Sequence, residues 1–256
     1  MKFNNRNVFI SPSAKIGANV KIGDNTVIYD NVTIGDNTII CNDCQIGEPT
    51  GDYYKNDDYQ NPPTVIGSDC LIRSHSIIYA TNVIGNHLIT GHHIMVRTGN
   101  KIGNNCSIGN GTELHGDAII GNYVRLHSDV CICEHAVIGN YVWIFPGSIL
   151  SNGVNPPGNL LLGPQIGDYT VLAVNVVVLP GVKIGEHCLL GASSLITKDV
   201  SAYSVMVGNP AKYVNDIREV KSKQTGEKYY PWPNNFERGM PWAGISYNEW
   251  LAAQKD

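Results

Sequence analysis

Aliphatic residues recur at every sixth position through the middle of the chain, from Ile66 to Leu150. Each sixth residue in that stretch is Ile, Val or Leu except for Thr90, and the phase never slips. The residue four places after most of these positions is small or medium-sized, as at Cys70 and Ser76. A period of six suits neither an α-helix, at about 3.6 residues per turn, nor coiled-coil heptads. It predicts a chain that forms one short strand and one turn every six residues, so that the aliphatic positions stack into one inner column.

Two shorter arrays with the same period flank this stretch, over residues 10–46 and 166–196. The segments between the arrays, 48–64 and 156–165, have no period, and we expect both to be loops ejected from a corner of the solenoid. The first contains three tyrosines and three prolines, and long excursions from a compact fold are typical of binding loops. Together the arrays predict about nine coils of three hexads each.

The hexad pattern resembles the left-handed β-helix of the hexapeptide-repeat acyltransferases, in which three hexads form one triangular coil. The resemblance implies an all-β, left-handed parallel β-helix over residues 1–212. The sequence Gly208-Asn-Pro-Ala-Lys212 is a common ending of the repeats in this group. Pro210 favours that ending because it cannot donate a hydrogen bond to a strand ladder.

Residues 213–256 are expected to form a C-terminal extension. We expect a short helix within 213–223, followed by a tail rich in Trp, Pro and Tyr. Aromatic rings without a core of their own must pack on something, either the side of the solenoid or a neighbouring subunit.

Composition narrows the possible function classes. The chain of 256 residues is 43% hydrophobic, which is ample for a core, and its net charge of −4 argues against a nucleic-acid surface. No apolar run reaches the length of a membrane span and the first ten residues are polar, so we expect a cytoplasmic protein without a membrane contact. Four of the seven cysteines occupy the small inward position of a hexad and are expected to be buried free thiols: Cys44, Cys70, Cys106 and Cys188. Cys41-x-x-Cys44 has no second pair of matching spacing, so it indicates no zinc site.

The residue directly after each hexad start distinguishes the three faces of the solenoid. One face carries only glycine, at Gly67, Gly85, Gly103, Gly121 and Gly139. The other two faces carry exceptions with polar or ionisable side chains, which include Arg73, Tyr79, Arg97, His115 and His127. One position further along lie His92, Glu134 and Asn152, of which the last two are one coil apart. We therefore expect the chemistry on two of the three faces, and His75, beside Arg73, is a further candidate.

A narrower resemblance rests on Leu71–Tyr79, Thr90–His93, Ile120–Ser128 and Trp143–Pro146. These segments resemble the nucleotide-linked amino-sugar N-acyltransferases, which act on dTDP-3-amino-3,6-dideoxyhexoses and related sugars for surface polysaccharides. The resemblance implies a homotrimer with sites in the grooves between neighbouring subunits, acyl-CoA as co-substrate and no metal.

The same resemblance assigns roles to residues of this chain. Those expected at the reacting amine are His127, Glu134, Asn152 and His115. Those expected to bind the sugar nucleotide are Arg73, His75, Tyr79, Arg97 and His92. Those expected along the coenzyme A groove are Ala173, Ala192, Lys198, Pro210 and Lys212.

Three alternatives remain open at this point. An O-acyltransferase of the lipid A type would depend strictly on a histidine base. A zinc enzyme like the γ-class carbonic anhydrases needs three converging histidines. His87 and His92 have a suitable spacing, but the expected upstream partner is Gly51. A non-enzymatic or ice-binding solenoid would need a flat, regular Thr-rich face, and no face has one.

Overall fold

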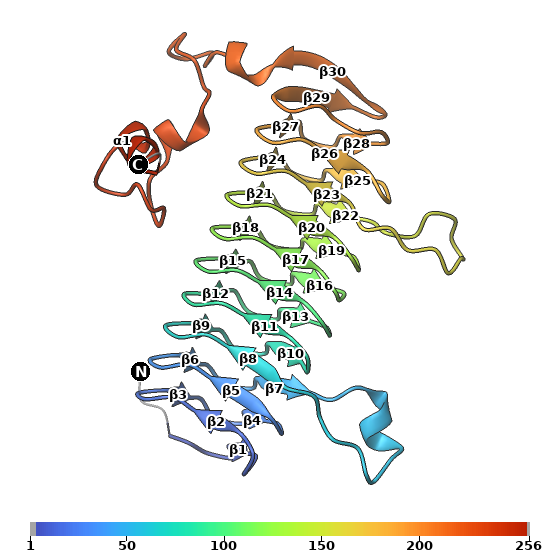
Figure 1. The fold of residues 1–256 in the computed structure, drawn as a ribbon, viewed down its shortest axis with the longest axis vertical. Coiled ribbons are helices and arrows are strands. Elements are labelled where there is room, and N and C mark those ends of the chain that lie inside the picture. Colours follow the sequence, from blue (N-terminus) through green and yellow to red (C-terminus); the bar gives the residue numbers. More distant parts are fainter. Residues whose placement is uncertain (1–3, 255–256) are drawn as a thin grey trace.

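The computed structural model describes residues 4–254 and folds the hexads into a three-sided parallel β-solenoid (Figure 1). Successive strands join three sheets in turn, here called sheets A, B and C. Sheet A contains β1 (Phe9–Ile10), β4 (Val27–Ile28), β7 (Gln45–Glu48), β10 (Ile77–Tyr79), β13 (Met95–Val96), β16 (Glu113–Leu114), β19 (Cys131–Ile132), β22 (Ile149–Leu150), β25 (Val177–Val178) and β28 (Leu195–Ile196). Sheet B contains β2 (Lys15–Ile16), β5 (Val32–Ile34), β8 (Thr64–Ile66), β11 (Val83–Ile84), β14 (Lys101–Ile102), β17 (Ile119–Ile120), β20 (Val137–Ile138), β23 (Gln165–Ile166) and β26 (Lys183–Ile184). Sheet C contains β3 (Lys21–Ile22), β6 (Ile39–Ile40), β9 (Leu71–Ile72), β12 (Ile89–Thr90), β15 (Ser107–Ile108), β18 (Arg125–Leu126), β21 (Trp143–Ile144), β24 (Val171–Leu172), β27 (Leu189–Leu190), β29 (Ser204–Gly208) and β30 (Ala211–Asp216).

This arrangement confirms the predicted fold class, with a slightly taller stack than the expected nine coils. Sheet A alone has ten strands, and each belongs to a different coil. The additional coil arises because β7 pairs with β10 although the chain leaves the solenoid directly after β7, and because β29 continues sheet C beyond the last regular hexad.

The inner column of the solenoid is the predicted one. Every hexad start from Ile66 to Leu150 is buried, and Thr90 occupies its place in the column with 1% of its surface exposed. The glycine face is structural, as expected. A Cβ atom built on Gly67 would lie 2.5 Å from the carbonyl carbon of Gly85 in the next coil, so neighbouring coils approach too closely for any side chain.

Three corners connect the sheets, and each is named here by the sheets that it joins. The A–B corner follows each strand of sheet A, the B–C corner follows sheet B and the C–A corner follows sheet C. Many turns place a residue in the left-handed backbone region, such as Asn37 at a φ of 56° and His75 at 63°. Asn and Asp tolerate this region better than most side chains, which explains their abundance in the chain.

Both predicted loops leave the solenoid at the A–B corner, and Figure 1 shows them projecting on the same side. The first connects β7 to β8 and contains the short 3₁₀ helix η1 (Gly51–Tyr54), where Tyr53 makes edge contacts with Tyr29 and Tyr59. The second connects β22 to β23. The turns of the A–B corner that follow β10, β13, β16 and β19 therefore lie between the two loops.

The start of the C-terminal extension differs from the expected helix within 213–223. β30 forms an antiparallel hairpin with β29, so residues up to Asp216 extend sheet C instead. Pairing with the exposed last strand supplies ladder hydrogen bonds that an isolated helix would not have. The short 3₁₀ helix η2 (Ile217–Glu219) follows, and the only α-helix among residues 4–254 is α1 (Tyr247–Ala253).

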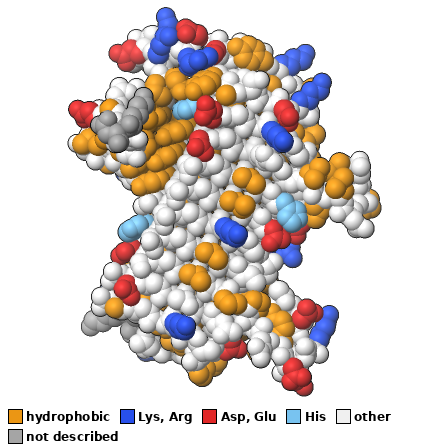
Figure 2. Space-filling model, viewed as in Figure 1, with side chains coloured by type: hydrophobic (Ala, Val, Ile, Leu, Met, Phe, Trp, Pro, Cys, Tyr) orange, Lys and Arg blue, Asp and Glu red, His pale blue; other side chains and the backbone are white. Residues whose placement is uncertain are grey.

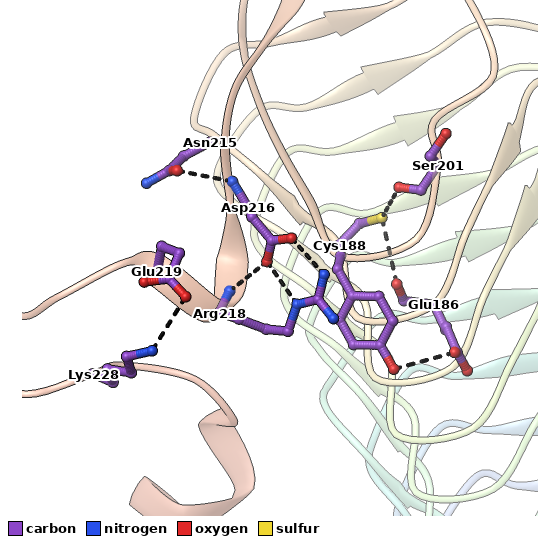
Figure 3. A network of polar contacts seen from close by, with 9 residues as sticks. Glu186, Cys188, Ser201, Asn215, Asp216, Arg218, Glu219 and Lys228 are labelled. Atoms are coloured by element: carbon purple, nitrogen blue, oxygen red, sulfur yellow. Dashed lines mark hydrogen bonds and ion pairs between the residues drawn. The ribbon is translucent and has the colours of Figure 1, made fainter.

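Figure 3 shows polar contacts within the beginning of the extension, beside the last coils of the solenoid. Arg218 pairs with Asp216 at 2.6 Å and lies over the ring of Tyr203 at 4.4 Å. Lys228 contacts Glu219 at 3.2 Å. Arg218 therefore links the extension to the side of the last coils.

The aromatic tail packs on the side of the solenoid, which confirms one of the two expected positions. Trp232 in the 3₁₀ helix η3 (Trp232–Asn235) donates a hydrogen bond to the Tyr169 carbonyl at 3.0 Å. A second hydrophobic cluster joins the tail to the solenoid and contains Trp232, Met240, Trp242 and Tyr247, with Tyr123, Tyr141, Trp143, Tyr169 and Val171 packed against it. Figure 2 shows hydrophobic side chains gathered where the tail lies against the solenoid.

Candidate active site

The A–B corner carries a column of polar side chains between the two ejected loops. The residues directly after the inward hexad starts of successive sheet A strands stack one coil apart, and they are Tyr79, Arg97, His115, Cys133 and Ser151. Tyr79 pairs with Glu48 at the base of the first loop. The predicted residues Tyr79, Arg97, His115, Glu134 and Asn152 therefore share one edge of the solenoid.

Glu134 and Asn152 form the central polar pair of this corner. The Asn152 Nδ2 donates a hydrogen bond to the Glu134 Oε2 at 3.2 Å, and both side chains are half-buried. Gly116 occupies the same position one coil below Glu134, with a left-handed φ of 136° that favours glycine. A Cβ atom there would lie 2.9 Å from the Thr98 carbonyl oxygen and 3.9 Å from the Glu134 Cγ. The absence of a side chain at Gly116 leaves Glu134 open from below.

His115 lies in a group of ionisable side chains on the adjoining part of sheet A. Its Nε2 is 3.1 Å from the Glu113 Oε2 and 3.6 Å from the Cys131 Sγ. A hydrogen bond between the two thiols raises the pKa of Cys131 and lowers the pKa of Cys133, with further lowering from the nearby His115. These side chains offer a nucleophile, a general base and metal-ligand atoms within a small area.

His127 lies at the C–A corner, away from the other three predicted catalytic residues. It follows β18 of sheet C, whereas His115 follows β16 of sheet A. The His127 ring stacks on Phe145 with 4.5 Å between ring centroids. Burial lowers the pKa of His127, and the charge of Arg125 lowers it further. Both effects favour the neutral form of the His127 imidazole.

Arg125 is held in place by the tail. Its guanidinium lies over the rings of Trp143, at 5.3 Å, and Phe236, at 5.1 Å, and donates a hydrogen bond to the Arg238 carbonyl at 2.7 Å. A cleft of about 420 Å³ opens beside Arg125 and His127, and the tail forms part of its wall. The tail residues thus shape the surroundings of His127.

A second cleft, of about 510 Å³, lies further along the same side of the solenoid. It is lined by Phe145, Ala173, Ala192, Trp232 and Phe236, among other mainly apolar side chains. Ala173 and Ala192 are the two positions expected to meet pantetheine, and the structure places both in one apolar cleft. Small side chains there leave room for a narrow, extended ligand.

The other predicted residues are distributed over both corners and the end of the solenoid. Arg73, His75 and His92 are exposed at the C–A corner, and His75 stacks on His93 with 4.7 Å between ring centroids. Lys198 follows β28 at the A–B corner, so it does not share an edge with Ala173 and Ala192. Pro210 and Lys212 are exposed in the hairpin of β29 and β30. The predicted residues therefore form separate groups at the two corners of one chain rather than a single group.

The residues considered for zinc do not gather in one chain. The Cys44 side chain is buried and its Sγ donates to the backbone carbonyls of Asn42 and Arg73, which explains its burial without a metal. His87 and His92 are exposed on different corners, and Gly51 lies in the first loop.

Sequence reasoning missed several residues of the site. Glu113, Cys131, Arg125 and Trp143 all occupy the outward position directly before a hexad start, whereas most candidates predicted from the sequence lie after one. The sequence signal for these four residues is an ionisable or aromatic side chain at that outward position. Phe236 had no such signal, because only tertiary packing brings the tail to Arg125.

Comparisons with known proteins support the fold and the repeat family. Residues 6–36, 13–48 and 163–198 match the bacterial transferase hexapeptide family, described as six repeats. The chain is also similar to the Arabidopsis UDP-N-acetylglucosamine acyltransferase structure, with a TM-score of 0.62, 17% identity, and coverage of 98% of this chain and 80% of that one. At that identity the likeness concerns the fold alone. These findings support hexapeptide repeats and the left-handed β-helix fold, and they do not reach the narrower amino-sugar group.

Curated relatives match shorter segments. A Staphylococcus aureus protein named as an acetyltransferase is 46% identical over 68 residues, which is 26% of this chain and 34% of that protein. The 2,3,4,5-tetrahydropyridine-2,6-dicarboxylate N-acetyltransferase of Ligilactobacillus salivarius is 38% identical over 60 residues, 23% of this chain and 26% of that protein. The chain thus spans about a third or less of the length of these relatives. Within residues 4–254, no helix has the length and apolar character needed to cross a membrane.

Proposed function

We propose that the chain is an acyl-CoA-dependent N-acyltransferase whose acceptor is the amino group of a nucleotide-activated sugar. The acceptor we favour is a dTDP-3-amino-3,6-dideoxyhexose, for surface polysaccharide biosynthesis, and the acyl group is acetyl or another short chain. The observation that carries the proposal is the Glu134–Asn152 pair at an open corner between two loops. A half-buried carboxylate that is already oriented by an amide is suited to bind a sugar ammonium group.

The acyl donor is proposed to bind at the C–A corner. The apolar cleft at Ala173 and Ala192 is suited to an extended pantetheine arm, with the thioester end at Phe145, against which the His127 ring stacks. Holding both substrates in fixed grooves is a proximity device, which lowers the entropic part of the barrier. The names of the curated relatives include both an N-acetyltransferase and a serine acetyltransferase, so they support acyl transfer in general.

The reaction needs little from a protein base. The neutral amine nitrogen attacks the thioester carbonyl carbon, the carbon–sulfur bond breaks, and the departing coenzyme A thiolate accepts the proton of the new ammonium group. Glu134 binds and orients the amine, Asn152 fixes Glu134, and backbone N–H groups stabilise the developing oxyanion. His115, Arg97 and Tyr79 would contact the sugar nucleotide from the same corner.

Because the residues around Glu134 lie at the A–B corner and those around His127 lie at the C–A corner, we infer that a complete site requires a second subunit. In a cyclic homotrimer the A–B corner of one subunit faces the C–A corner of the next, which joins Glu134 to the His127 of a neighbour. Arg73, His75 and His92 would then approach the sugar nucleotide from the opposite wall of the groove. Lys198, at the A–B corner, would likewise reach the coenzyme A phosphates from the neighbouring subunit, and Pro210 and Lys212 would border the end of that groove.

Mass spectrometry of products from a panel of dTDP-amino sugars and acyl-CoAs tests the reaction. An N-acylated sugar supports the proposal, and acylation of hydroxyls alone contradicts it. Subunit mixing tests the shared site. A chain with His127→Asp and a chain with Glu134→Lys should each be nearly inactive. Co-refolding the two chains in equal amounts should restore activity at about a quarter of the interfaces. Each interface has an even chance of receiving a wild-type His127 from one subunit and an even chance of receiving a wild-type Glu134 from the other. No recovery from a verified mixed trimer would contradict a site built from two subunits.

One observation favours an O-acyltransferase as a second candidate. His127 is held neutral by burial and by Arg125, which is the protonation state that a general base requires. The pH profile described in the Discussion separates the two candidates.

A further inference from the structure

Four potential metal-ligating side chains share one outward patch of sheet A. Glu113 and His115 are two residues apart in the coil of β16, and Cys131 and Cys133 are two residues apart in the coil of β19. Side chains two residues apart on a strand project to the same face. Glu113 pairs directly with Cys131 across the ladder, so the four side chains form the corners of a small square.

The donor atoms within this square lie close to one another. One ligand atom each of His115, Cys131 and Cys133 lies within 4.8 Å of the other two, and this is the single group of its kind among residues 4–254. The Cys131 Sγ is 3.6 Å from the His115 Nε2, which in turn is 3.1 Å from the Glu113 Oε2. Zinc bonds of about 2.3 Å to sulfur and about 2.0 Å to nitrogen in a tetrahedron separate the donors by roughly 3.5 Å. Small side-chain rotations are enough to bring the three donors onto one ion.

The chemistry of the donors selects a particular class of cation. Two thiolates and an imidazole favour zinc over magnesium or calcium, which prefer oxygen ligands. The patch is also accessible, since 31% of the His115 side chain and 47% of the Glu113 side chain are exposed. Glu113 and Cys131 lie in strands β16 and β19, and His115 and Cys133 directly follow these strands. The packed solenoid therefore fixes all four backbone positions before an ion arrives.

We propose that His115, Cys131 and Cys133 bind one zinc ion, with the Glu113 carboxylate as the fourth ligand. The thiols release their protons to solvent as the ion binds. This site departs from the sequence-based expectation of no metal. It goes beyond the proposed acyl transfer, because binding is measured without either substrate.

The test is a titration of the full chain with zinc alone, after treatment with a chelator and a phosphine reductant. We expect calorimetry to give one ion per chain. Cobalt(II) should give the thiolate-to-metal charge-transfer absorbance of a site with sulfur ligands. Cys133→Ser and His115→Gln should each weaken zinc binding by at least about 100-fold, and Glu113→Gln by about 10-fold, given that even outer groups contribute 10–100-fold.

Matched variants control for general effects. Cys41→Ser removes a half-buried thiol outside the patch, and His135→Gln removes an exposed histidine nearby, so both should bind zinc as the wild type does. If the patch variants do not fold, alkylation of the wild-type chain provides the test. Zinc should then protect Cys131 and Cys133, mapped by mass spectrometry, and leave Cys41 reactive. Sub-stoichiometric uptake without a sulfur-to-cobalt band, or protection that does not distinguish these thiols, would overturn the site.

Discussion

The Asn152 side chain donates a hydrogen bond to the carboxylate of Glu134 from one coil above it, with 3.2 Å between Nδ2 and Oε2. The contact follows from the coil itself, since residues 18 apart occupy the same place on the solenoid except where a loop intervenes. Asn152 lies two residues after the end of β22, where the second ejected loop leaves the solenoid, so the pair lies at the base of that loop.

The first prediction concerns this pair. Glu134→Ala should lower turnover substantially while leaving it measurable, because the substrate amine is nucleophilic without a protein base. Glu134→Gln keeps an acceptor for Asn152 but loses the charge, so it should raise the KM for the amino sugar more than it lowers kcat. Steady-state kinetics with both substrates varied provide the check. If Glu134→Gln and Asn152→Ala instead lose the same amount of kcat/KM, the pair contributes only through its geometry and not through the charge of Glu134.

The first loop provides the second prediction. Tyr53 and Tyr54 are exposed to 43% and 68%, and Tyr53 is braced by edge contacts with Tyr29 and Tyr59. Exposed, braced rings can stack on a nucleotide base. Tyr53→Ala combined with Tyr54→Ala should raise the KM for the sugar nucleotide about 10-fold or more, with little change for acyl-CoA. Equal increases in the KM for the sugar nucleotide and the KM for acyl-CoA would indicate a structural role of the loop.

Most of the fold was predictable because burial in this architecture depends on local period alone. Ile66, Ile72 and Ile78 follow one another at six-residue intervals and lie in sheets B, C and A, so a single phase predicts all three sheets. The glycine corner was predictable for a similar reason, since every coil faces the same steric limit there.

The candidate site was only partly predictable. The column of His115, Glu134 and Asn152 follows from the period, whereas the contact between Arg125 and Phe236 joins residues more than a hundred positions apart. The expected helix within 213–223 is confined to the short 3₁₀ helix η2, because the open edge of β29 pairs with the residues up to Asp216 and local propensity does not reveal such an edge. Tertiary contacts of this kind leave no periodic trace in the sequence.

The third prediction tests the register of the core. Ile102 is 4% exposed, and its neighbour Lys101 points outward from the same strand. Ile102→Asp should prevent folding or cost more than about 4 kcal/mol, since it buries a charge without a partner. Lys101→Asp, the matched control, should change the free energy of unfolding by less than about 0.5 kcal/mol. Urea denaturation followed by circular dichroism measures both. A cooperatively folded Ile102→Asp chain of normal stability would refute the register.

The fourth prediction concerns stability in acid. The His187 ring is stacked between Tyr169 and Tyr203, with centroid distances of 4.7 and 5.1 Å, and its Nδ1 is buried without a hydrogen-bond partner. Burial lowers the pKa of His187 below its usual 6.5, against a smaller opposite effect of Glu186 and Asp168. The unfolded chain therefore binds a proton before the folded chain does as the pH falls below about 6.5, and the free energy of unfolding decreases through that window.

His187→Phe isolates this effect. Phe keeps the stack, and the left-handed backbone of His187 is no obstacle because Tyr169 and Tyr203 adopt the same conformation at φ values of 58° and 65°. We expect the variant to lose part of the acid sensitivity of the wild type, measured as denaturation midpoints above and below pH 6.5. Identical pH dependence in the two chains would show that His187 titrates alike in the folded and unfolded states.

The last prediction separates a positioning role of His127 from general-base catalysis. Burial and Arg125 lower the pKa of His127, so its titration in the free enzyme should lie below 6.5. If transfer is to an amine, the rate should continue to rise with pH above that value as the substrate ammonium group loses its proton. His127→Asn keeps a polar side chain of similar reach, and it should lower kcat by less than about 100-fold, the lower end of base catalysis. The pH dependence above neutrality should survive in the variant, because it belongs to the substrate. The contrary outcome is that His127→Asn abolishes turnover and that the wild-type rate rises with the titration of a single protein group and is constant at higher pH. In that case His127 is a general base, and the acceptor is a hydroxyl group.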